Sequence, residues 1–247
     1  MSPAIEPSVA GIRRAVMDHL KPPFMPAELW LIVLFVTTAT NLIDFAVKPD
    51  PGMAETPLFV AAMVVRVIAV FWINFAIIRR MAGITNPFAP GLPLLRFGAL
   101  TFLLAAGSGI FAVVANVAAG AEAEIADRWM ARILSLMIWT AFTIGLFAWQ
   151  AALAIDDPEF KLQGMHQRQR GKLTPLWLAF AAIILPFAAI HVALTMIGVK
   201  LALSPAALAA LALVDGAAST VQLVATCALA VVAWKLASPL REGPAPR

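Results

Sequence analysis

The chain has 247 residues, of which 62% are hydrophobic and 13% are charged, and its formal net charge is +4. Soluble domains carry about 25% charged residues, so this composition excludes an ordinary water-soluble protein and predicts a multi-pass membrane protein. The single cysteine, Cys227, excludes an intramolecular disulfide and any metal site built from several cysteines.

The N-terminal segment, residues 1–26, precedes the first long apolar run and is polar and rich in proline, unlike a cleavable signal. Four apolar residues recur within it at helical spacing: Val9, Ile12, Val16 and Leu20. Charged residues lie mostly off this stripe, which predicts a short amphipathic helix that ends at Pro22. Two interpretations remain open: the stripe lies among lipid headgroups on the cytoplasmic face, or it packs on a neighbouring loop.

Six apolar runs are each long enough to cross a bilayer, which takes about 20 helical residues. They are Ala27–Val47, Pro57–Ile78, Leu94–Ala119, Met130–Ile155, Pro175–Val199 and Pro205–Trp234. The last run is longer than a bilayer needs, so it either tilts or begins as an interfacial piece. We therefore predict an all-α fold: a polytopic bundle of six transmembrane helices over residues 27–236, with a disordered cytoplasmic tail at 237–247.

The basic residues predict the orientation of these helices. Of the 18 lysines and arginines, thirteen fall in one set of loops and four in the opposite set. The positive-inside rule then places both termini in the cytoplasm of a bacterial inner membrane. The expected partners are anionic lipid headgroups on the cytoplasmic side and other membrane proteins. Nucleic acid is not expected, because the basic residues are spread over four segments that lack stacking aromatic residues.

A charged residue lies inside the second run, in the stretch "MVVRVIAVFWINF" (Met63–Phe75). Counting along the spans places it in the outer half of the membrane with four other polar residues. This predicted intramembrane polar cluster consists of Arg66, Asp44, Asn41, Asp215 and His191. In one interpretation, Arg66 bonds Asp44 or Asp215 and fixes the helix packing; in another, the cluster lines a periplasmic cavity that holds a ligand or relays protons. In a third, Arg66 contacts a partner subunit or snorkels to the surface.

Catalytic and metal-binding motifs are not found in the sequence. It contains no H-E-x-x-H, no G-x-S-x-G, no P-loop and no Gly-rich dinucleotide turn. The three histidines are far apart in the chain, so neither a metal site nor a cofactor is predicted. The acidic turn "DDPEF" (Asp156–Phe160) groups three carboxylates, but it has the pattern of a solvated loop.

The segment after this turn, "KLQGMHQRQRGKLTPLW" (Lys161–Trp177), is a short basic stretch. It leads to a span that contains proline and then to a long final span. This layout resembles a bacterial six-helix membrane group that includes the membrane domain of some glycerophosphodiester phosphodiesterases. The tyrosine often found at the end of that group's last helix is missing, and so is a phosphodiesterase domain. The resemblance therefore implies a six-helix fold and does not imply the phosphodiesterase activity.

Three functional hypotheses follow. The first is a non-enzymatic inner-membrane protein that serves as an accessory, scaffold or stabilising subunit of a membrane complex. The second is a small transporter or permease subunit that uses the polar cluster in the outer half of the membrane. The third is a membrane enzyme that acts on lipid, for which "DDPEF" offers the carboxylates that come nearest to a catalytic group.

Overall fold

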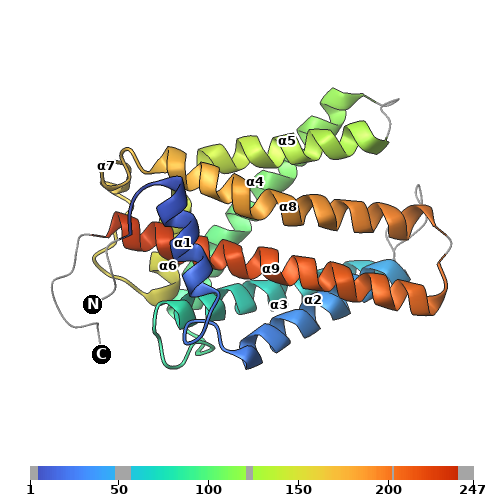
Figure 1. The fold of residues 1–247 in the computed structure, drawn as a ribbon, viewed down its shortest axis with the longest axis horizontal. Helices are drawn as coiled ribbons and strands as arrows, with labels where there is room; N and C mark the ends of the chain where they lie inside the picture. Colours follow the sequence, from blue (N-terminus) through green and yellow to red (C-terminus); the bar gives the residue numbers. More distant parts are fainter. Residues whose placement is uncertain (1–4, 48–56, 121–124, 202, 239–247) are drawn as a thin grey trace. The chain divides into compact units, whose positions relative to one another are not determined.

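The computed structural model describes residues 5–47, 57–120, 125–201 and 203–238, and in these residues every regular element is a helix (Figure 1). The helices are α1 (Val9–His19), α2 (Ala27–Val47), α3 (Pro57–Met81), α4 (Leu92–Ala119), α5 (Ile125–Thr143), α6 (Leu146–Ile155), α7 (Met165–Arg168), α8 (Leu173–Lys200) and α9 (Pro205–Ala237). The predicted all-α fold is confirmed for the described part of the chain. Residues 239–247 of the predicted tail lie outside the described part of the chain.

Three of the described helices are long and apolar enough to cross a membrane: α4, the Leu173–Leu194 part of α8, and α9. A bent pair, Ile133–Thr143 of α5 with α6, makes a fourth candidate if it is counted as one broken span. A shorter apolar stretch, Ala27–Ile43, lies in α2. The described residues thus contain three or four candidate membrane spans.

The predicted span Met130–Ile155 is not one continuous helix. The axis bends by 69° between α5 and α6, at a break beside Gly145. The hydroxyl of Thr143 donates to the carbonyl oxygen of Trp139 at 2.9 Å, one turn earlier, and such bonds favour bending. Glycine is also a poor helix former. The hydropathy pattern did not register this break, because every residue near it is compatible with hydrocarbon.

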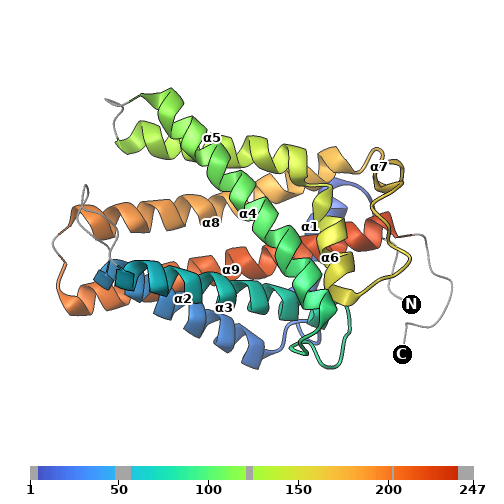
Figure 2. The same ribbon diagram turned by 180° about the vertical axis from the view of Figure 1, so that it is seen from behind.

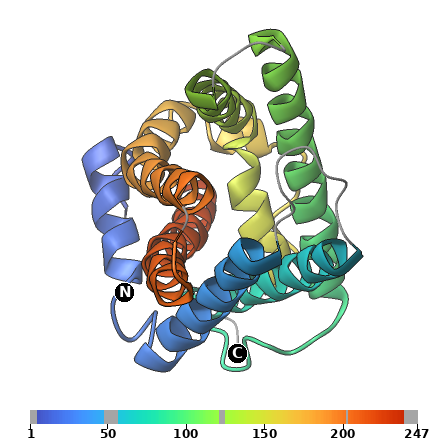
Figure 3. The same cartoon turned by 90° about the vertical axis from the view of Figure 1, so that its right-hand side faces the viewer.

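The chain forms two compact units. Unit 1 comprises residues 1–18, 90–181 and 228–247, and unit 2 comprises residues 19–89 and 182–227, so that α8 and α9 contribute to both. In unit 1, α4 packs against α5 and α6 (Figure 2). In unit 2, α2 and α3 lie side by side (Figure 3).

Helix α1 belongs to unit 1 apart from its last residue. Its apolar residues Ile12 and Val16 are fully buried, whereas Arg13 and Arg14 are exposed. Burial of these two residues favours packing of the helix on a neighbouring part of the chain, but Val9 and Leu20 of the same stripe are only partly buried, so the interfacial helix stays a prediction.

The acidic turn after α6 is tied to the last turns of α9. The indole Nε1 of Trp234 donates to Asp157 Oδ2 at 3.0 Å, and Lys172 Nζ donates to the carbonyl oxygen of Leu236 at 2.6 Å. The lysine therefore caps the C-terminus of α9, where a positive charge is favourable. Asp156 is mostly exposed, as expected of a solvated turn, but Asp157 holds neighbouring elements together.

Candidate functional site

The candidate site lies in unit 2, where α2 crosses α9 at very close range. A Cβ atom added to Gly216 of α9 would lie 2.8 Å from the Cα atom of Thr38 in α2. The hydroxyl of Thr37 donates to the Gly216 carbonyl oxygen at 3.0 Å or to the Thr220 hydroxyl at 2.8 Å. Only a glycine fits at position 216. The close approach of α2 to α9 brings Asn41 and Asp215 within hydrogen-bonding distance.

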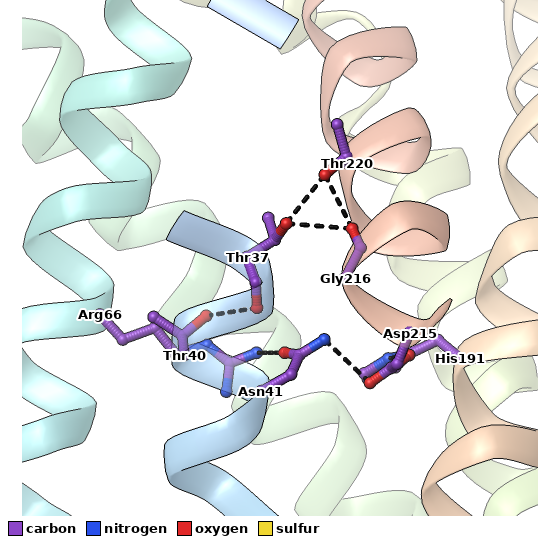
Figure 4. A network of polar contacts seen from close by, with 8 residues as sticks. All are labelled: Thr37, Thr40, Asn41, Arg66, His191, Asp215, Gly216 and Thr220. Atoms are coloured by element: carbon purple, nitrogen blue, oxygen red, sulfur yellow. Dashed lines mark hydrogen bonds and ion pairs between the residues drawn. The ribbon is translucent and has the colours of Figure 1, made fainter. Parts of the chain in front are cut away.

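Four polar side chains from four helices form one hydrogen-bonded network (Figure 4). Arg66 of α3 donates through Nη2 to Asn41 Oδ1 of α2 at 3.2 Å. Asn41 Nδ2 donates to Asp215 Oδ2 of α9 at 2.9 Å. Asp215 Oδ1 lies 2.6 Å from His191 Nδ1 of α8. Asp215 is thus held on both oxygen atoms.

The chemistry of the side chains fixes the direction of these bonds. Because a guanidinium can only donate, the amide oxygen of Asn41 must face Arg66 and its NH2 group must face Asp215. One carboxylate oxygen of Asp215 is therefore an acceptor. With Asp215 ionised, its other oxygen accepts the Nδ1–H of His191, and Nε2 carries the free lone pair of the neutral imidazole.

Burial differs sharply along the network. The residue exposures of Asp215 and Asn41 are 1% and 2%, while 36% of the His191 side chain is exposed. Arg66 is half-buried, and Val64 and Val65 beside it are exposed. The network therefore joins a buried carboxylate to a partly exposed imidazole.

The structure brings together four of the five residues in the predicted polar cluster. Asp44 belongs to α2, but its side chain lies outside the described part of the structure. The described contacts connect Arg66 to Asp215 through Asn41. Both predicted roles of the cluster, fixing the helix packing and holding a ligand or relaying protons, stay predictions.

Sequence reasoning missed the crossing point that positions this cluster. Gly216 and Thr220 are four residues apart and face Thr37 of α2. Small residues at this spacing mark close helix contacts in membranes, so the stretch "GAAST" carried a usable signal.

Among the described residues, no group of three or more histidine, cysteine, aspartate or glutamate side chains is placed to hold a metal ion. Comparison of the chain with models of protein families, with curated proteins and with solved structures gave no match. The site must therefore be interpreted from its own geometry.

Proposed function

We propose that this chain is a bacterial inner-membrane protein with six spans and both termini in the cytoplasm, and that it acts as a non-enzymatic accessory or stabilising subunit. The candidate spans among the described helices and the bias of the basic residues between loops support the topology. Anionic lipid headgroups are its partners on the cytoplasmic side.

One observation carries the accessory role: α4 exposes a continuous apolar face. Seven large side chains at helical spacing line it, and each is more than half exposed: Leu95, Phe102, Leu103, Ile110, Val113, Val114 and Val117. Another side of α4 packs within unit 1, where Gly107 contacts the indole of Trp139. A long apolar face beside a packed one suits lateral contact with another membrane helix as well as with lipid.

Site-specific photocrosslinking in native membranes tests the accessory role. A photoreactive residue at Phe102 or Ile110 should give an adduct with one discrete protein. The same residue at Leu100, which is only 7% exposed on the same helix, is the matched control and should give no such adduct. If the exposed positions yield lipid adducts alone, the accessory role fails.

Thiol labelling tests the topology separately. In a Cys227→Ala background, single cysteines within Glu122–Asp127 should react with an impermeant reagent added outside intact cells. Cysteines within Gln163–Gly171 should react only after the cells are opened. The reverse pattern would overturn the proposed orientation.

A second candidate function is a small permease subunit. The observation that favours it is the partly exposed imidazole of His191 at one end of a network whose central residues, Asn41 and Asp215, are buried. Intramembrane ionisable residues often mark substrate or proton pathways. Purification in mild detergent followed by mass spectrometry separates the two candidates: a stoichiometric protein supports the accessory role, and a retained small molecule supports the permease.

A further inference from the structure

We propose that the His191–Asp215 pair is a proton-binding site, in which Nε2 of His191 takes up the proton. The proposal goes beyond the accessory role and deepens the permease candidate, which rests on the same residue, but it requires only the geometry of unit 2. A failure of the crosslinking experiment would therefore leave it standing.

The fixed direction of the hydrogen bonds is the first step of the argument. Arg66 orients the amide of Asn41, and the amide presents N–H to Asp215. The carboxylate of Asp215 in turn holds a proton on Nδ1 of His191 at a heavy-atom distance of 2.6 Å. This arrangement selects one tautomer of the neutral ring and makes Nε2 the acceptor.

The second step concerns charge. A proton from the aqueous phase joins the Nε2 lone pair, and the resulting imidazolium forms an ion pair with Asp215 at the existing distance. Among the described side chains, the other charged group in the network is Arg66, which Asn41 separates from the carboxylate. Asp44 lies one turn beyond Asn41 on α2.

Access is the third step. Asp215 is sealed, with 2% of its side chain exposed, so a proton from outside cannot reach the carboxylate directly. The histidine has 36% of its side chain exposed, so it is the member of the pair that a proton from outside the protein can reach.

Nitrogen-15 NMR of histidine-labelled protein in detergent tests the proposal. The chain has three histidines, so a His19→Gln, His166→Gln background leaves His191 as the single labelled ring. Over the range in which histidines change charge, about pH 5 to 8, we expect Nδ1 to stay protonated. The Nε2 signal should move from the unprotonated to the protonated range. A ring whose two signals do not change across this range would overturn the proposal.

The variant Asp215→Ala, in the same background, removes every side-chain acceptor at this position and checks the role of the carboxylate. Without it, the preference for the Nδ1–H tautomer should be lost, and the neutral ring should give averaged signals from both tautomers. If the variant keeps the parental tautomer and pH response, the paired site is refuted, because His191 would then bind its proton independently of Asp215.

Discussion

Replacement of Asp215 by leucine should destabilise the protein, because it removes the acceptor of two interhelical hydrogen bonds. Such bonds contribute on average about 0.6 kcal/mol each in membranes, with a maximum near 1.7. The NH2 group of Asn41, in a residue that is 2% exposed, is also left without its acceptor. An unpaired buried polar group costs about 1–3 kcal/mol. Together these terms predict a loss of about 2–4 kcal/mol in the free energy of unfolding.

Reversible unfolding in mixed micelles, with increasing denaturing detergent, measures this loss. The matched control is Asp156→Asn, because Asp156 is 61% exposed in its side chain, lies 3.5 Å from Arg96 and has a φ of 58°, which asparagine tolerates. An exposed ion pair contributes about 0.2–1 kcal/mol. If Asp215→Leu costs no more than Asp156→Asn, the network does not stabilise unit 2 and our reasoning is wrong.

Two further predictions concern close packing at glycines. Gly216→Ala should cost about 1–3 kcal/mol in unfolding free energy, because the new Cβ atom would overlap Thr38. The control is Gly98→Ala, whose Cβ atom would meet nothing within 4 Å and which should be neutral or slightly stabilising. Equal effects of the two substitutions would contradict the close crossing. Gln169→Ala should lower the melting temperature of the protein, because Gln169 Nε2 donates to the Gly145 carbonyl oxygen at 2.9 Å. The control Gln167→Ala, at an exposed position, should leave the melting temperature unchanged. Equal melting temperatures of the two variants would show that this bond contributes nothing.

The all-α class could be predicted because it follows from composition and apolar run length, which do not depend on how helices meet. The polar cluster was predicted from depth: counting residues along each span put Arg66, Asp44, Asn41, Asp215 and His191 in the same half of the membrane. The structure joins four of them by hydrogen bonds, and the side chain of Asp44 lies outside its described part.

The connectivity of that cluster could not be predicted in the same way. Which side chain bridges two others depends on the rotation of each helix about its axis, and the helices carry almost no apolar periodicity to reveal it. Asn41 is the example: the sequence showed it near Asp44, but its position between Arg66 and Asp215 follows from the approach of α2 to α9 at Gly216. The bend beside Gly145 was missed for a related reason, because the carbonyl oxygen of Gly145 accepts a hydrogen bond from Gln169, which lies 24 residues further along the chain.

That bend also bears on how the protein is made. The carbonyl oxygen of Gly145 is paired by a side chain 24 residues further along the chain, so Gly145 leaves the ribosome before its partner exists. A backbone carbonyl without a partner is unfavourable in hydrocarbon. We therefore expect α5 and α6 to remain straight, or in contact with water at the break, until the segment that carries Gln169 has been synthesised. In this chain the order of translation would then set when the bend between α5 and α6 forms.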